Sequence, residues 1–340
     1  MKSPLIGLTY DLRSDYLALG YAAELVAEFD EHVTIDALEA AIRAAGYATQ
    51  RIGNLRALAQ RLVAGDRWDL VFNIAEGLGG RNREAQVPAL LEAYGVPCAL
   101  SDPLVCAVTL DKSIAKRLVN SYGLATPAFH VVREPRDIAG VSLPYPLFAK
   151  PIAEGTGKGI DKASRIENAG QLQRVCSALL EAHHQPVLVE EFLPGREFTV
   201  ALLGTGARAR VLGTLEVEIL PNAGTTIYSF EIKERCAEFC RYSRPARAPV
   251  IEAVERLALE SYRALEVRDL GRVDVRLDRE GRPAFIEVNP LPGLNPVHSD
   301  LPMIASQEGM SFDALIAAVL ESALARTATE RACRPDLPVV

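Results

Sequence analysis

The chain has 340 residues, which predicts two or three domains because an ordinary domain holds roughly 150 residues. Hydrophobic residues make up 49% and charged residues 24% of the sequence, a globular composition that excludes collagen, coiled coils and disorder. The formal net charge of −7 argues against a general nucleic-acid binder, since neutralising phosphates requires a basic surface.

The N-terminus carries no signal for secretion. Residues 1–10 lack the long apolar core and cleavage site of a signal peptide, and no apolar run approaches the ~18 residues that span a membrane. The six cysteines are scattered without a CxxC pair, which favours free thiols in a reducing compartment. We therefore expect a cytoplasmic protein with no membrane partner and no nucleic-acid partner.

The first hundred residues alternate between predicted strands and predicted helices. Starting with a strand, the elements are expected at Pro4–Thr9, Thr34–Ala45, Tyr47–Ile52, Leu55–Val63, Asp69–Asn73 and Glu84–Tyr94. This order predicts a parallel sheet with helices on its faces, and we assign residues 1–100 to an N-terminal parallel α/β domain.

Beyond residue 100 the pattern is richer in strands. Helices are expected at Asp111–Tyr122, Ala169–Ala182, Val250–Leu265 and Phe312–Ala325. Strands are expected at Ala128–Val132, Pro146–Lys150, Pro186–Glu191, Glu197–Leu203, Arg208–Glu218, Gly271–Asp278 and Pro283–Asn289. We divide this part into a central domain, residues 101–195, and a C-terminal domain, residues 196–328.

The last two of these strands form a predicted hairpin with the strongest chemical signal. A four-residue turn that leaves Asp278 opposite Pro283 sets Asp274 opposite Glu287, with Cβ atoms of such pairs about 4.5–5.5 Å apart. Two carboxylates so close repel each other unless a cation lies between them. With Asn289 they form an oxygen-only set of the kind that Mg²⁺ selects.

The same register sets Arg272 opposite Asn289, and strict alternation puts Phe285 on the face of Glu287, away from Ile286. An ordinary hairpin with a solvated polar face is the alternative interpretation. Against it, the second strand leads into Pro290–Gly293, a rigid and irregular segment rather than a surface turn.

Two further segments carry weaker signals for a nucleotide. Lys150 ends a predicted strand, and the glycine-rich loop 154–160 follows, where backbone N–H groups can approach phosphate closely. Glu190 and Glu191 end another strand before a Pro-Gly turn, in a segment that could contact an adenine edge. Ordinary turns are the alternative for both segments, and neither the P-loop nor the dinucleotide fingerprint is present.

Taken in this order, the segments resemble the ATP-grasp superfamily and, within it, the D-alanine–D-alanine ligases. The resemblance runs from about residue 1 to about 325 and is most specific in Gly271–Ser299. It implies an ATP-grasp fold of mixed α/β and α+β class, in which two β-rich halves follow the N-terminal domain and enclose the nucleotide. It also implies an ATP-dependent reaction that joins a carboxylate to an amine, with amino-acid-like molecules as substrates. The implied cofactors are ATP and Mg²⁺, with two ions expected, and the implied oligomeric state is a homodimer.

The resemblance assigns a role to each candidate residue by its position. The nucleotide-binding positions are Lys112, Lys150, Gly155, Thr156, Gly157, Glu190, Glu191, Leu193 and Glu197. The magnesium positions are Asp274, Glu287 and Asn289. The catalytic positions are the mobile-loop lysine, the arginine that steadies the oxyanion and two residues near the second amino acid: Lys233, Arg272, Gly293 and Ser299.

A carboxylate is a poor electrophile, so it must first be phosphorylated. The lysines and magnesium neutralise the negative charges of the carboxylate and the triphosphate, which must come close together in this step. The acyl phosphate must then be protected from water. We expect lids at Gly155–Gly159 and Tyr228–Arg241.

The sequence departs from the family where the first amino acid is held. A serine, a tyrosine, a histidine and an apolar residue of the family are replaced by Gly157, Glu234, Glu76 and Asp300. The family's N-terminal glutamate corresponds to Asp30 or Glu31. A ligase with an altered first-substrate site is the main hypothesis. A nucleotide-binding protein without turnover and, with less support, an NAD-dependent enzyme are the alternatives.

Overall fold

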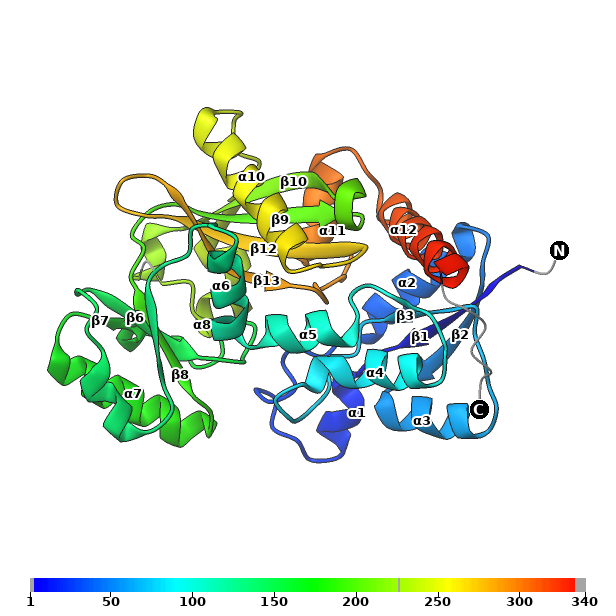
Figure 1. The fold of residues 1–340 in the computed structure, drawn as a ribbon, viewed down its shortest axis with the longest axis horizontal. Coiled ribbons are helices and arrows are strands. Elements are labelled where there is room, and N and C mark those ends of the chain that lie inside the picture. The colour runs from blue at the N-terminus through cyan, green and yellow to red at the C-terminus, as the bar shows by residue number, and fades with distance from the viewer. Residues whose placement is uncertain (1–2, 226, 334–340) are drawn as a thin grey trace.

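The computed structural model describes residues 3–225 and 227–333, which contain three β-sheets (Figure 1). The first is parallel, as predicted, and its strand order is β2-β1-β3-β4. Its strands are β1 (Leu5–Thr9), β2 (Ala48–Gly53), β3 (Leu70–Asn73) and β4 (Cys98–Ala99). Its helices are α1 (Arg13–Ala18), α2 (His32–Ala44), α3 (Leu55–Val63), η1 (Arg83–Ala85) and α4 (Gln86–Ala93). Helix α3 has its predicted bounds, because the Asn54 side chain accepts from the N–H groups of Arg56 and Ala57 and caps it.

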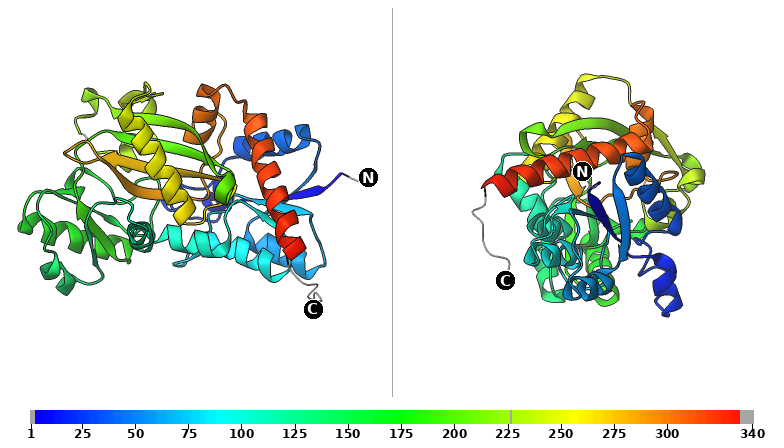
Figure 2. Two further views of the ribbon diagram at one scale, coloured as in Figure 1. Left: turned by 45° about the horizontal axis from the view of Figure 1, so that its top comes forward. Right: turned by 90° about the vertical axis from the view of Figure 1, so that its right-hand side faces the viewer.

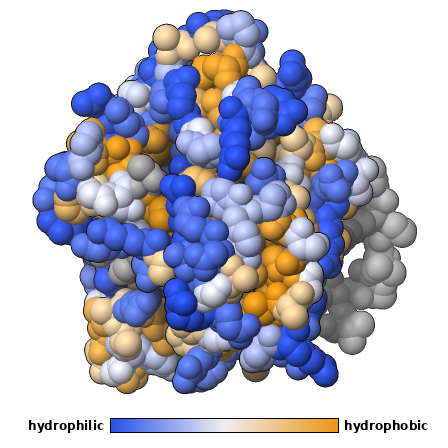
Figure 3. All heavy atoms as spheres, turned by 90° about the vertical axis from the view of Figure 1, so that its left-hand side faces the viewer, coloured by the Kyte–Doolittle hydropathy of each residue, from blue (hydrophilic) through white to orange (hydrophobic). Residues whose placement is uncertain are grey.

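The second sheet is antiparallel, with strand order β5-β8-β6-β7. It consists of β5 (Phe129–Val132), β6 (Leu147–Pro151), β7 (Arg165–Ile166) and β8 (Val187–Glu191), with η2 (Pro135–Gly140) and η3 (Lys162–Ser164) between strands. Helix α7 (Ala169–His183) covers one face through Leu172 and Cys176. The surface at this end of the molecule is largely hydrophilic, interspersed with smaller apolar groups (Figure 3).

The third sheet has strand order β11-β10-β9-β12-β13 and is antiparallel throughout. Its strands are β9 (Glu197–Leu203), β10 (Arg210–Ile219), β11 (Cys240–Ser243), β12 (Leu270–Leu277) and β13 (Pro283–Asn289). Helices α6 (Lys112–Ser121) and α10 (Pro249–Ala264) share its core, Val119 and Val254 being fully buried beside Val273.

Several short elements were not predicted from the sequence. They are α5 (Pro103–Leu110), η4 (Gly206–Arg208), η5 (Pro221–Ala223), α8 (Phe230–Glu234), α9 (Cys236–Phe239) and α11 (Asp300–Gln307), besides α1, β4, β7, β11, η2 and η3. Helix α5 had a readable signal. Asp102 accepts from the N–H of Val105 and Pro103 occupies the first turn, so this segment carries the signature of a helix start.

The predicted pairs of the hairpin are confirmed for the candidate site residues. Asp274 is opposite Glu287, and Arg272 is opposite Asn289. The two carboxylates therefore share one end of the β12–β13 pair, next to the loop that follows Asn289.

At the turn of the hairpin the predicted register is wrong by one residue. Leu277, not Asp278, lies opposite Pro283, and a bulge at Ile286 absorbs the difference. The predicted face of Phe285 is therefore also wrong. Phe285 is fully buried in the core, and Ile286 points with Glu287 toward a cavity.

The last helix, α12 (Phe312–Cys333), is longer than predicted and returns to the N-terminal part (Figure 2). Leu315, Ile316 and Val319 are fully buried in one core with Ile35 of α2. No single helix in the described ranges is long and apolar enough to cross a membrane. The bent α11–α12 pair passes such a test only when both helices are taken together, across a bend of 106°. The division of the chain into three domains stays a prediction.

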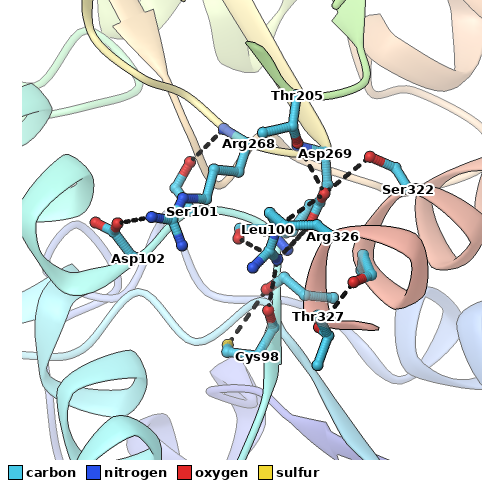
Figure 4. A network of polar contacts seen from close by, with 12 residues as sticks. Cys98, Leu100, Ser101, Asp102, Thr205, Arg268, Asp269, Ser322, Arg326 and Thr327 are labelled. Carbon is cyan, nitrogen blue, oxygen red and sulfur yellow. Dashed lines mark hydrogen bonds and ion pairs between the residues drawn. The ribbon is translucent and has the colours of Figure 1, made fainter. Parts of the chain in front are cut away.

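A buried polar cluster around Asp269, which precedes β12, joins the end of the first sheet, the third sheet and α12 (Figure 4). We name it the Asp269 cluster: Leu100, Thr205, Asp269, Ser322 and Arg326. The Leu100 N–H and Arg326 Nη2 donate to Asp269 Oδ2 at 3.0 and 2.7 Å. The hydroxyls of Thr205 and Ser322 donate to Oδ1 at 3.0 and 2.9 Å. Asp269 is fully buried, with φ at +61°, a conformation that Asp tolerates better than most residues.

Candidate functional site

The residues predicted for the site all line one or both of two adjoining cavities. The first cavity, of about 100 Å³, is lined by Lys112, Lys150, Gly155, Gly157, Glu190, Glu191, Leu193, Glu197, Lys233, Asp274 and Glu287. The second cavity, of about 340 Å³, adds Thr156, Arg272, Asn289, Gly293 and Ser299. Lys112, Gly155, Lys233 and Glu287 line both, so the two cavities meet at these side chains.

A buried ion-pair chain forms one side of the first cavity. Glu190, 3% exposed, holds Lys150 Nζ at 2.8 Å on one oxygen and Lys116 Nζ at 2.9 Å on the other. Burial lowers the pKa of Lys116 to about 8, against the raising effect of Glu190. Lys116 was missed from the sequence, although it lies one helical turn after Lys112 on α6. Lys116 and Lys150 share the single negative charge of Glu190, so the group carries a net positive charge at the cavity. Lys150 is thereby positioned to bind an incoming phosphate.

The rest of the first cavity combines an apolar slot with a carboxylate. Phe148, Phe192 and Ile286 line the slot beside Leu193, and the bulge described above is what turns Ile286 into it. Glu197 accepts from Arg276 Nη1 at 2.9 Å, which fixes its carboxylate. A flat heterocycle and a sugar hydroxyl would find matching surfaces here.

The acidic pair of the hairpin lies where the two cavities meet. Asp274 accepts from Arg272 Nη2 and from Thr199 Oγ1, both at 3.0 Å, and Glu287 lies 3.4 Å from Lys112 Nζ. Burial raises the pKa of Glu287, but Lys112 and neighbouring cations outweigh it and hold that pKa well below its usual range. Burial also raises the pKa of Asp274. Glu287 therefore stays ionised at neutral pH.

These residues fit a magnesium site by the chemistry of their donors. Asp274, Glu287 and Asn289 present only oxygen acceptors at one strand end. The described residues hold no group of three His, Cys, Asp or Glu side chains that could bind a metal ion by themselves, so an amide and substrate phosphates would have to complete the shell. Mg²⁺ usually binds through one or two carboxylates together with water and phosphates. Asn289 Oδ1 also accepts from the Leu291 N–H at 3.0 Å, which orders the loop behind it.

The second cavity is bounded by Arg272 and the start of α11. Arg272 Nη1 donates to Asp300 at 3.1 Å, so this arginine lies between Asp274 and Asp300. Ser299 Oγ accepts from the Asn295 N–H at 3.0 Å, and a Cβ on Gly293 would lie 2.9 Å from that oxygen. Gly293 therefore leaves space beside Ser299 that a larger residue would fill.

Both segments expected to act as lids contribute residues to the cavities, and their closing over the site stays a prediction. Lys233 Nζ stacks 4.7 Å from the ring centre of Tyr228, whose hydroxyl is 2.6 Å from that of Tyr242. Lys112 Nζ donates to the Glu154 carbonyl at 2.6 Å and holds the start of the glycine loop. The side chain of Glu234 lies outside the described part of the structure.

A third acid of this segment, Glu28, contacts the glycine loop, which was not expected from the sequence. Glu28 lies 3.2 Å from both Lys158 Nζ and Arg83 Nη2. Asp30 and Glu31 line the second cavity together with Glu28, and the assignment of either to the family's N-terminal glutamate stays a prediction. The sequence could not decide among acids only a few residues apart.

Replacing Glu28 by glutamine should loosen the glycine loop, because Lys158 and Arg83 would lose their shared carboxylate. Hydrogen bonds to charged groups contribute roughly 1.5–3 kcal/mol, so we expect about tenfold faster amide hydrogen exchange in residues 153–160. Glu24→Gln, at an exposed carboxylate nearby, is the matched control. Equal exchange in both variants would show that Glu28 does not restrain the loop.

Comparison with known proteins agrees with this geometry. A family model described as "D-ala D-ala ligase C-terminus" matches residues 118–321. A D-alanine–D-alanine ligase of Bordetella petrii is 35% identical over 272 residues, 79% of this chain and 79% of that protein. An uncharacterized protein, y4sG, of Sinorhizobium fredii is 35% identical over 256 residues, 75% of this chain and 74% of that protein.

The fold is compared with a crystal structure of D-alanine–D-alanine ligase from Bacillus anthracis complexed with ATP. The TM-score is 0.73 at 20% identity, over 96% of this chain and 100% of that chain. The predicted ATP-grasp architecture is confirmed by this likeness. The family model covers more than half of the chain, and the identity to a curated ligase extends over most of both sequences. The chain therefore belongs to the D-alanine–D-alanine ligase family of the ATP-grasp superfamily.

Proposed function

We propose that the protein is an ATP-dependent carboxylate–amine ligase that joins two amino acids or amino-acid-like molecules and releases ADP and phosphate. The observation that carries the proposal is the convergence of Lys112, Lys150, Lys233 and Arg272 on the Asp274–Glu287 pair, where the two cavities meet. Membership of the family, the apolar slot and the fixed Glu197 carboxylate support ATP as the nucleotide.

The reaction has two steps. A donor carboxylate oxygen attacks the terminal phosphorus of ATP, and ADP leaves with the electrons of the broken P–O bond. The acceptor amine then attacks the acyl carbon, the new C–N bond replaces the C–O bond, and phosphate leaves while the amine loses a proton. Bound Mg²⁺ would neutralise phosphate charge during the first step.

The residues of the chain have distinct tasks in this scheme. Lys150 and Lys112 bind phosphate oxygens, and Glu190 keeps Lys150 in place. Arg272, anchored by Asp274 and Asp300, is positioned for the negative oxygen that develops on the acyl carbon. Tyr228 and Lys233 cover the site and exclude water, which would otherwise hydrolyse the acyl phosphate.

The test is incubation with ATP, Mg²⁺ and pooled D- and L-amino acids, with ADP measured enzymatically and products identified by mass spectrometry. We expect ADP release together with a condensed product. ATP-induced thermal stabilisation without turnover on any pool would instead indicate a nucleotide-binding protein without ligase activity.

The variant Lys233→Met tests the part that this lysine of the covering segment takes in the reaction. Loss of a charge positioned for the transition state is expected to lower kcat about 10²–10³-fold, while ATP still stabilises the fold. Lys162→Met, at an exposed lysine, should leave kcat unchanged. An unaltered kcat in Lys233→Met would remove this lysine from the mechanism.

A further inference from the structure

The carboxylates that line the second cavity differ in how closely cations approach them. Glu287 lies 3.4 Å from Lys112, Asp300 lies 3.1 Å from Arg272, and Glu28 lies 3.2 Å from both Lys158 and Arg83. Asp30, Glu76 and Glu84, from the N-terminal part of the chain, line the same cavity and have no cation within 3.5 Å among the described residues. We name these three residues the acidic wall.

Among the residues of the acidic wall, Glu84 gives the strongest evidence for a bound cation. It lies on η1, is 8% exposed and accepts no hydrogen bond from the described residues. The nearest cation is Arg83 Nη2 at 3.8 Å, too long for a hydrogen bond, and that nitrogen already donates to Glu28 at 3.2 Å. Burying a carboxylate is costly unless close partners compensate for it, and one shared ion pair at 3.8 Å compensates for little of that cost, so a cationic ligand in this cavity would stabilise Glu84.

Glu76 adds a second carboxyl group that interacts with Glu84. It follows β3 and likewise accepts no side-chain ion pair from the described residues. Burial raises the pKa of Glu84 to about 7, and burial together with the charge of Glu84 raises that of Glu76. A cation between the two side chains would stabilise both carboxylates in their ionised form.

Resting on the ligase function proposed above, we propose that one of the two substrates is a basic amino acid, whose side-chain ammonium or guanidinium group binds to Glu76 and Glu84. The cavity of about 340 Å³ lies within the roughly 300–1,000 Å³ of pockets that bind small molecules, so it can hold a long side chain. Arg272 and Lys233, which line the same cavity, suit the carboxylate of such a substrate.

The kinetic test compares each basic amino acid with a neutral analogue of similar length: lysine with norleucine, and ornithine with norvaline, in D and L forms. For at least one pair, kcat/KM with the basic member should be at least about 30-fold higher. In Glu84→Gln and Glu76→Gln the preference should fall to within about threefold. Glu181→Gln, an exposed carboxylate on α7, should keep the preference of the unmodified protein.

A binding test separates this inference from the ligase function. Thermal stabilisation by lysine and by norleucine is measured in the presence of a non-hydrolysable ATP analogue. Stabilisation by lysine alone, lost in Glu84→Gln, supports the acidic wall even if no turnover is found.

ADP release with neutral amino acids at the same kcat/KM as with basic ones would overturn the inference and leave the ligase function intact. Lysine stabilisation that persists in both glutamine variants would also overturn it. ADP release in no mixture overturns the ligase function, and the binding result then decides the inference.

Discussion

Replacing Glu287 by glutamine is expected to abolish most ligase activity, with ADP release falling at least about 10³-fold at saturating ATP. Glutamine keeps the shape of the side chain but removes the negative charge. Lys112 and the cations around it would then lose the carboxylate that balances them, and the site would lose a magnesium ligand. The measurement is kcat over a series of Mg²⁺ concentrations, with far-UV circular dichroism to verify the fold.

The matched control is Glu280→Gln, at the exposed turn of the same hairpin. It changes the net charge equally and should leave kcat and the Mg²⁺ requirement unchanged. If Glu287→Gln retained full activity at low Mg²⁺, the assignment of the hairpin carboxylates to the metal would be refuted.

The largest expected effect on stability comes from Asp269→Ala. The substitution removes the closest partner of Arg326, whose side chain is 9% exposed, and leaves that charge only the longer ion pair with the exposed Glu330 at 3.4 Å. Breaking a buried ion pair from one side costs about 3–5 kcal/mol. We therefore expect unfolding in urea at a clearly lower midpoint, monitored by intrinsic fluorescence.

Two further variants make this expectation specific. Ser322→Ala removes a single hydrogen bond to Asp269 and should cost only about 0.5–1.5 kcal/mol. Asp269→Asn tolerates the positive φ but lacks the charge, so its midpoint should lie between those of Ser322→Ala and Asp269→Ala. Equal midpoints for Asp269→Ala and Ser322→Ala would show that the Asp269 cluster is not a major contributor to stability.

The regular parts of the fold were predictable from local sequence patterns. The alternation of strands and helices predicted the parallel sheet, and the bounds of α3 and β13 are those expected. The short helices α8 and α11 were missed, because so few turns give little periodicity and tertiary packing decides them. The bulge at Ile286 was missed because nothing in an apolar run marks the extra residue.

The residues of the candidate site likewise divide into those that could be predicted from local sequence and those that could not. Residues in local motifs, such as Lys150 and Glu287, could be found because spacing along one segment brings them to the cavity. Lys116 and Glu28 were missed because their importance depends on partners far away in the chain: Glu190 and Lys158. Such contacts are set by how the domains pack, and a single sequence carries no direct record of them.

The return of α12 to the first sheet also constrains the order in which the protein can form during synthesis. The apolar face of α2, including Ile35 and Leu38, emerges from the ribosome long before Leu315 and Val319, which complete its core. The second sheet, in contrast, lies within residues 129–191 and can form before α12 has been made. The α12-facing side of α2, although made early, stays incompletely covered until the end of synthesis, and a nascent chain must keep this face from aggregating until translation is nearly finished.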